Sequence, residues 1–155
     1  QVGCSKEEAQ QYIDRFFTRY PGVQAYVNQM KTDVRTKGFV TTLLGRRRVI
    51  DGARNLSRKV RGVAERAAVN APIQGSAADV LRLAMKELAM DRTLREAGWK
   101  MLLQVHDELL FQGPEDSDPQ VSKHVEEVMA RPGGLELLVP LTASGQCGKN
   151  WGEAK

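Results

Sequence analysis

The first 37 residues repeat apolar and polar positions with the period of an α-helix. Residues 5–8 read Ser-Lys-Glu-Glu, a capping-box sequence that predicts a helix running to about residue 20. Pro21-Gly22 ends that helix, and apolar residues spaced by four, three and four predict a second helix over about residues 23–37, capped by Gly38. We expect the first helix to bury its apolar stripe, which consists of Ile13, Phe16, Phe17 and Tyr20.

Three later segments have the short apolar runs of β-strands. Residues 39–44 and 47–50 predict a small hairpin that turns at Gly45-Arg46. Residues 101–111 predict a second hairpin, because two apolar runs flank the polar pair His106-Asp107, which we expect at or next to its tip. Residues 135–143 predict a last strand, in which Pro140 favours an edge position or a bulge.

Helical periodicity also returns after residue 57. It predicts a helix over about residues 58–70 and a break at Ala71-Pro72, because proline lacks the amide donor that a helix needs. Ser76 and Asp79 form a capping box that predicts a restart and a helix to about residue 97. Asp118, followed by Pro119, predicts the N-cap of a last helix over 118–130.

The fold class that follows is α+β. A helical portion comes first, and a small antiparallel sheet built from residues 99–111 and 135–143 follows it. The helices over residues 76–97 and 118–130 are expected to pack on one side of this sheet.

Composition is that of a globular protein. The chain has 155 residues, of which 41% are hydrophobic and 27% charged, and no apolar run approaches the ~20 residues of a membrane span. The first residues lead directly into polar sequence, so no signal peptide is expected. Two cysteines are too few for a disulfide framework or a zinc site, which fits a reducing compartment.

Charge is distributed unevenly along the chain. Residues 31–66 contain eleven Lys and Arg against three acids, whereas residues 101–155 contain four bases against nine acids. This asymmetry favours a polyanion along the basic part and a cation in the acidic part. Two solvated faces of opposite sign are the alternative.

The tip of the second hairpin is the first candidate site. Asp107 and Glu108 follow an apolar strand, and a carboxylate in such surroundings is unfavourable unless a cation or a donor meets it. The tip therefore suggests a metal or a polar ligand. A solvated acidic turn would give the same sequence, and a metal-dependent phosphodiester hydrolase using His106, Asp107 and Glu108 is a further alternative.

Two groups of residues are candidates for nucleic-acid contacts. Arg66, Asn70 and Gln74 recur every fourth residue, and their donors suit the acceptors that every base pair presents in the minor groove. Arg46, Arg47 and Arg48 have the charge to bind phosphates. The alternatives are an exposed polar helix face and a solubilising basic turn.

Residues 42–48, 64–79 and 103–109, together with residues 148–151 and 154–155, resemble successive motifs of family A DNA polymerases. The resemblance covers essentially the whole chain in order, and it is strongest to the bacterial branch, because the motifs are joined without long insertions. It implies a DNA-directed DNA polymerase that transfers a nucleotide from a dNTP to a primer 3′-hydroxyl.

The resemblance also implies roles for single residues. Asp107 matches the motif C aspartate, which shares two Mg²⁺ ions with an aspartate of motif A, and Glu108 matches the adjacent acid. His106 and Gln104 match positions near the primer terminus. The remaining matches are Arg66, Asn70 and Gln74, which touch primer–template DNA in the minor groove, and Arg46, Arg47 and Arg48, near the template or duplex phosphates.

Motif A and the fingers helix that grips the nucleotide have no counterpart in this sequence. The resemblance implies that residues 1–56 are the rear of the fingers and residues 57–155 the C-terminal part of the palm. Its implied partners are primer–template DNA, a dNTP and an N-terminal part of the polymerase, and we expect the chain alone to be inactive. A bacterial cytoplasmic location at the nucleoid is implied, with an organelle as the alternative. A non-catalytic nucleic-acid-binding module is the main rival function.

Overall fold

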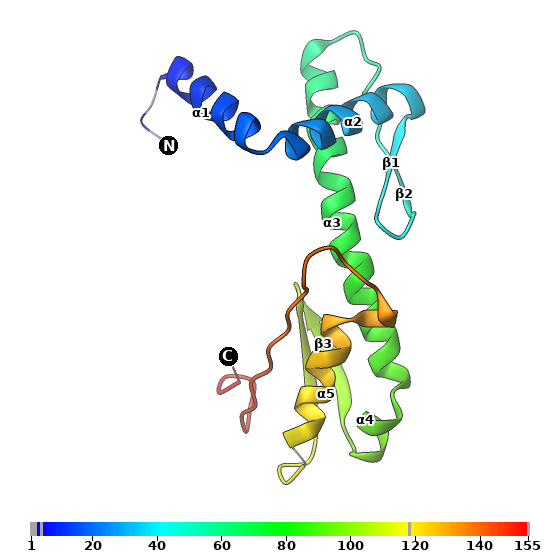
Figure 1. Ribbon diagram of the computed structural model, residues 1–155. Coiled ribbons are helices and arrows are strands. Elements are labelled where there is room, and N and C mark those ends of the chain that lie inside the picture. The colour runs from blue at the N-terminus through cyan, green and yellow to red at the C-terminus, as the bar shows by residue number, and fades with distance from the viewer. Residues whose placement is uncertain (1–2, 4, 118, 155) are drawn as a thin grey trace. The chain divides into compact units, whose positions relative to one another are not determined.

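The computed structural model describes residues 3, 5–117 and 119–154. Its elements follow in chain order (Figure 1): α1 (Lys6–Arg19), α2 (Pro21–Lys37), β1 (Phe39–Thr41), β2 (Arg47–Val49), α3 (Arg58–Met90), α4 (Arg92–Glu96), β3 (Lys100–Val105), β4 (Glu108–Gln112), α5 (Pro119–Ala130) and the 3-10 turn η1 (Pro132–Gly134). The helices and two small antiparallel sheets confirm the α+β class. The chain divides into two compact units, residues 1–76 and 77–155, and the boundary lies within α3. The predicted boundary between fingers and palm at residues 56 and 57 is a functional one and stays a prediction.

In the first unit, α1 begins as predicted but does not bury its stripe. Ser5 and Glu8 form the reciprocal capping box, with hydrogen bonds of 2.8 and 3.1 Å. No residue of α1 is buried, and Phe16 stays 49% exposed. The expectation of a core stripe is therefore wrong for this chain, because the aromatic rings of Phe16 and Tyr20 pack on each other, 5.1 Å apart, rather than beneath another element.

A small core joins α2, the β1–β2 hairpin and the first half of α3. Its buried side chains are Val34, Val40, Ala53, Ala64 and Ala68. The Tyr26 hydroxyl donates a hydrogen bond of 2.8 Å to the carbonyl of Val69, which ties α2 to α3. The predicted hairpin over residues 39–50 is confirmed, with Phe39 opposite Val49 and Thr41 opposite Arg47.

Helix α3 runs through the predicted break. Pro72 lies inside it and is buried, and the helix continues for 33 residues. The Ser76 hydroxyl donates to the carbonyl of Pro72 at 2.5 Å and accepts from the amide of Leu43 at 2.8 Å. Ser76 is therefore not an N-cap, and the predicted capping box with Asp79 is wrong. The loss of one helical hydrogen bond at Pro72 is outweighed by the packing of this segment and by the Ser76 bridge.

The same helix ends earlier than predicted, at Met90. Asp91 lies at the N-cap of α4, and its carboxylate accepts from the amide of Leu94 at 2.9 Å. A capping aspartate starts a new helix because it satisfies a backbone donor that has no partner in the first turn. Gly98, with φ of 75°, then leads into β3.

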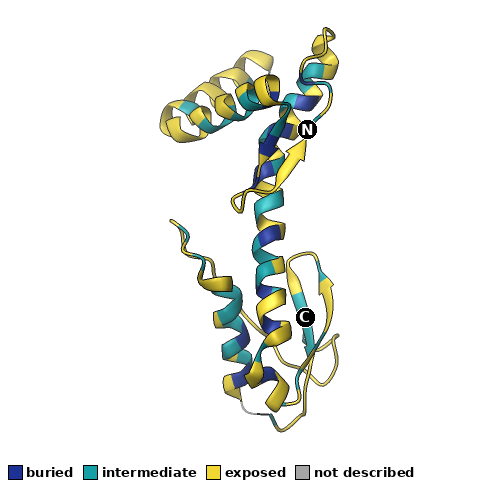
Figure 2. Ribbon diagram, turned by 90° about the vertical axis from the view of Figure 1, so that its right-hand side faces the viewer, coloured by how far each residue is buried: buried dark blue, intermediate teal, exposed yellow. Residues whose placement is uncertain are grey.

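The second unit packs helices against one face of the β3–β4 hairpin. Leu88, Leu94, Val121 and Val125 are its buried core, and partly buried Leu109 and Phe111 of β4 pack against them. Leu109 and Phe111 are two residues apart and share one face of the strand. The predicted arrangement of helices on one side of the hairpin is confirmed. Figure 2 shows how buried positions recur in bands along α3, with exposed positions between them.

The predicted strand over residues 135–143 is wrong. The described part of this segment has no strand, and the sheet consists of β3 and β4 alone. Gly133 and Gly134 both have positive φ, which turns the chain after α5, and Pro140 has no amide for a sheet ladder. The amide of Gly145 then bonds to the carboxylate of Glu126 at 2.7 Å, so the tail follows α5 rather than the sheet. The predicted N-cap at Asp118 lies outside the described residues.

Within the described residues, none of the helices has the length and apolar character needed to cross a lipid bilayer.

Candidate functional site

The β3–β4 hairpin forms as predicted, and its tip is a two-residue turn. Val105 pairs with Glu108, so His106 and Asp107 form the turn between the strands. His106 has a φ of 56°, in the left-handed region that side chains other than glycine rarely occupy. The side-chain amide of Gln104 donates a hydrogen bond of 2.9 Å to the carbonyl of His106, which fixes the turn from one side.

The acidic side chains of the tip point to solvent. Asp107 and Glu108 are exposed, and within the described residues neither carboxylate forms an ion pair. Carboxylate oxygens are the hard ligands that Mg²⁺ prefers, so the donor type fits this ion. No group of three His, Cys, Asp or Glu side chains gathers among residues 3, 5–117 and 119–154.

The predicted polar stripe is intact because α3 does not break. Arg66, Asn70 and Gln74 are exposed and lie on one side of a continuous helix. Four residues advance a helix by about 6 Å, so the three donors form a row along the helix axis. The structure brings these residues together in the first unit, whereas the hairpin tip belongs to the second unit.

The three arginines of the β1–β2 hairpin have different surroundings. The Arg46 guanidinium donates to the carbonyl of Gly75 at 3.2 Å, which joins the hairpin to α3. The Arg47 guanidinium lies over the ring of Phe39, 4.9 Å from its centre. Arg48, on the middle of β2, is exposed. Arg46 and Arg47 therefore have structural contacts besides any role in phosphate binding.

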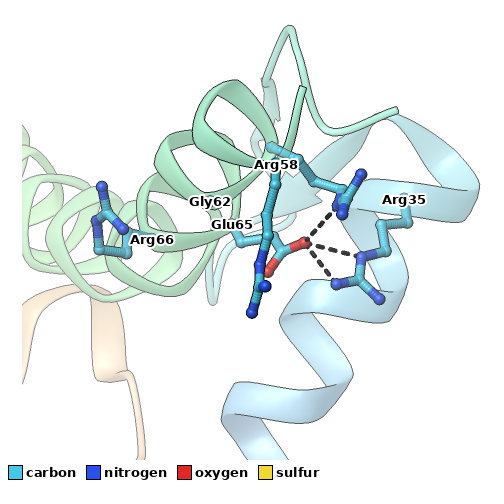
Figure 3. A pocket seen from close by; sticks show the side chains of 6 residues that line it. Arg35, Arg58, Gly62, Glu65 and Arg66 are labelled. Atoms are coloured by element: carbon cyan, nitrogen blue, oxygen red, sulfur yellow. Dashed lines mark hydrogen bonds and ion pairs between the residues drawn. The ribbon is translucent and has the colours of Figure 1, made fainter. Parts of the chain in front are cut away.

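Sequence reasoning did not single out a basic pocket at the start of α3 (Figure 3). Its lining is Arg35, Arg58, Arg61, Gly62, Glu65 and Arg66. The spacing of 58, 61, 62, 65 and 66 is that of one helix face and could have indicated the α3 side of the pocket. Arg35 comes from α2 and lies 30 residues before Glu65 in the sequence. No sequence pattern indicates that it lines the pocket.

His124 of α5 also has a specific contact that the sequence pattern did not indicate. Its Nε2 lies 2.8 Å from the Asp91 carboxylate, so α5 is joined to the residue that caps α4. Burial of Asp91 disfavours its charged form, but hydrogen bonds from His124 and from the Leu94 amide outweigh it, and the pKa of Asp91 is lowered.

Comparison with known proteins gives a consistent result. The profile of DNA polymerase family A matches residues 1–153. DNA polymerase I of Pseudomonas aeruginosa is 43% identical over 99% of this chain and 17% of its own length, and DNA polymerase I of Streptococcus pneumoniae is 42% identical over the same shares. The chain thus spans 17% of the length of these curated relatives.

A solved structure is also similar. It is described as the POL domain of Pol1 from M. smegmatis in complex with DNA primer-template and dNTP. The TM-score is 0.88 and the sequence identity 40%, over 99% of this chain and 27% of that one. The fold and the sequence therefore point to the same group of proteins.

Proposed function

Because the chain belongs to DNA polymerase family A, we propose that it takes part in template-directed transfer of a nucleotide from a dNTP to the 3′-hydroxyl of a primer. The observation that carries this proposal is the hairpin tip, where Asp107 and Glu108 are exposed and have no ion-pair partner among the described residues. The similar POL domain was solved with primer-template DNA and a dNTP, which supports the choice of substrates.

Asp107 and Glu108 would hold divalent metal, and Mg²⁺ fits their oxygen donors. Two ions held there would lower the pKa of the attacking hydroxyl and stabilise the leaving pyrophosphate. The protein's part is to hold the two carboxylates in place at the turn. Since the described chain gathers no third donor, an aspartate from motif A of the polymerase would complete the site. We therefore expect no synthesis by the 155-residue chain alone.

His106 and Gln104 would lie at the primer terminus. The exposed imidazole of His106 can contact the primer, whereas the Gln104 amide already donates to the carbonyl of His106. Gln104 therefore stabilises the conformation of the turn. Its effect on DNA would be indirect, because the turn determines where His106 and Asp107 lie.

The stripe of Arg66, Asn70 and Gln74 would contact the minor groove of the primer–template duplex. Minor-groove acceptors are similar for all base pairs, which suits an enzyme that copies any sequence. Arg46, Arg47 and Arg48 would lie near the template or duplex phosphates, and Arg48 is exposed on β2. Residues 1–56 would belong to the fingers and residues 57–155 to the palm, in a protein of the bacterial cytoplasm or of an organelle.

A non-catalytic nucleic-acid-binding module is the second candidate. It is favoured by the basic pocket and by the incomplete set of metal donors in the described chain. The two functions differ in what they require of Asp107, because a carboxylate is essential for metal binding but repels DNA phosphates.

The test combines the chain with a polypeptide that carries motif A and the fingers helix, and measures primer extension. We expect synthesis only from the combination, and Asp107→Ala should reduce it by about 10³-fold or more. Asp116→Ala is the matched control, since it removes an exposed acid from the loop after β4. Duplex binding, measured by fluorescence anisotropy, should survive both substitutions. Equal synthesis by Asp107→Ala and Asp116→Ala would favour the binding module.

A further inference from the structure

We propose that Arg35, Arg58 and Arg61, arranged around Glu65, form a binding site for phosphate groups of a nucleic-acid backbone. The proposal rests on the proposed function, because it extends the DNA contact of the α3 stripe to the sugar–phosphate strand beside the groove. None of these three arginines belongs to the residues assigned to DNA above.

Glu65 organises the site. Its side chain is 14% exposed, and its Oε1 accepts from Arg35 Nε at 3.0 Å and from Arg35 Nη2 at 2.5 Å. Arg61 Nε lies 3.8 Å from the same oxygen, and Arg61 Nη1 donates to the carbonyl of Asn55 at 3.1 Å. Figure 3 shows Glu65 between α2 and α3, with Arg35 reaching it from the α2 side. Two guanidinium groups are thereby held in place before any ligand binds, which lowers the entropy lost on binding.

The pocket nevertheless keeps a positive surplus. It is lined by four arginines against one carboxylate, so three positive charges are uncompensated. Arg58 is exposed and forms no ion pair within the described residues. It also lies in the first turn of α3, where the helix dipole adds positive potential. The cavity measures about 640 Å³, far more than the ≈30 Å³ of a water molecule, and so has room for a phosphate group.

The pocket adjoins the stripe along α3, because Arg66 belongs to both. Arg58, Gly62, Arg66, Asn70 and Gln74 recur every fourth residue of α3, and Arg58 is about 12 Å along the axis from Arg66. Gly62 lines the pocket without a side chain. A Cβ there would lie 3.7 Å from Arg66 Nη1, which is an ordinary contact distance. The strands that border a groove carry a phosphate at every 3.4 Å, and arginine binds them through paired hydrogen bonds. Donors that reach into the groove and arginines that reach its bordering strand therefore follow one another on α3.

The test measures binding of a fluorescein-labelled 14-base-pair duplex to the full chain between 50 and 300 mM KCl. Arg58→Gln is the informative variant, because Arg58 forms no ion pair among the described residues and is exposed, so its loss leaves the fold unchanged. We expect a loss of about 3- to 10-fold in affinity at 100 mM KCl, and a fall of about 0.9 in the slope of log Kd against log salt. Arg58→Lys should restore the slope, because it restores the charge.

Lys59→Gln is the matched control. Lys59 is the next residue, is exposed and carries the same charge, but it does not line the pocket. We expect it to weaken binding by less than twofold. Equal effects of Arg58→Gln and Lys59→Gln would overturn the proposal, since they would reflect the general field of the basic unit. Failure of the proposed function is distinguishable, because the wild-type chain would then not bind the duplex at all, or Asp107→Ala would leave synthesis intact.

The phosphate groups that bind the pocket could also come from a free anion such as inorganic pyrophosphate. Calorimetric titration with pyrophosphate distinguishes this anion from a nucleic-acid backbone. Pyrophosphate binding that depends on Arg58, together with duplex binding that does not, would also overturn the assignment to a nucleic-acid backbone.

Discussion

The side-chain amide of Gln104 donates a hydrogen bond of 2.9 Å to the carbonyl of His106, and His106 has a left-handed φ of 56°. The residue that follows His106 is Asp107, the proposed metal ligand. The direction of the Asp107 carboxylate therefore depends on a turn that Gln104 stabilises from β3. This relationship makes the geometry of the tip a testable part of the mechanism.

Gln104→Ala should slow synthesis by the combined polymerase about 10- to 100-fold, because a displacement of the carboxylate by about 1 Å is enough for such a loss. The apparent Kd for duplex DNA should stay within about twofold, because the stripe on α3 is unchanged. Gln112→Ala, at the other end of β4, is the control and should have little effect. Rates for Gln104→Ala that match this control would mean that the hydrogen bond does not position the carboxylate.

The left-handed backbone at the tip also predicts a stability difference. His106→Gly should be about 1 kcal/mol more stable to urea than His106→Ala, because a Cβ is unfavourable at this φ whereas glycine adopts it freely. The comparison with alanine removes the imidazole in both variants. Equal stabilities would show that the turn relaxes to an ordinary conformation when the side chain is lost.

Gly75 predicts a close contact between α3 and the β1–β2 hairpin. A Cβ at this position would lie 2.6 Å from Cγ2 of Thr42, so Gly75→Ala should lower the free energy of unfolding by about 1–3 kcal/mol. Gly62→Ala lies in the same helix, where the nearest atom would be 3.7 Å away, and should be neutral or stabilising by up to about 1 kcal/mol. Stabilisation of both variants would contradict the close packing at Gly75.

The contact between Asp91 and His124 predicts a dependence on acid. The pKa of Asp91 is lowered in the folded state, so its contribution is present above the unfolded value of about 3.9 and is lost as the pH falls through the folded value. Asp91→Asn should therefore be less stable than the wild type at pH 7 and should approach it at about pH 3, as measured by urea unfolding. The side chain of Lys37 lowers the pKa of Asp33. Asp33 is present in both the wild type and Asp91→Asn, so it does not affect the difference in stability between them. A difference in stability that is the same at both pH values would contradict this role of Asp91.

The sequence predicted the elements whose cause is local. The β3–β4 hairpin follows from two apolar runs around His106-Asp107, and the capping box at Ser5 and Glu8 forms as expected. The predicted break at Pro72 was wrong. The prediction used only the hydrogen bond that proline cannot make, which is a local feature. The hydrogen bonds of Ser76 to Pro72 and to Leu43, 33 residues away, join the helix to the hairpin and depend on the fold. The strand over 135–143 was wrong because a strand needs a partner, which the pattern of one segment does not reveal.

The candidate site likewise has residues that a local pattern indicates and residues that depend on contacts between distant segments. The helical repeat indicated the row Arg66, Asn70 and Gln74. The predicted break at Ala71-Pro72 would have separated Gln74 from it, and the continuous α3 keeps the three residues on one side. The basic pocket could not be predicted, because Arg35 reaches Glu65 from another helix. The contact between His124 and Asp91, 33 residues apart, was missed for the same reason.

The central claim is that Asp107 is a metal ligand in nucleotidyl transfer, and exchange of the ligand atom tests it most directly. In the combined polymerase, Asp107→Cys should be inactive with Mg²⁺, which disfavours sulfur, and should regain synthesis with the softer Mn²⁺ or Cd²⁺. Asp107→Ser, which offers no thiolate, should stay inactive with each metal. Recovery of Asp107→Cys but not of Asp107→Ser is the result that the account predicts. Full activity of Asp107→Cys in Mg²⁺, or no recovery in either softer metal, would contradict it.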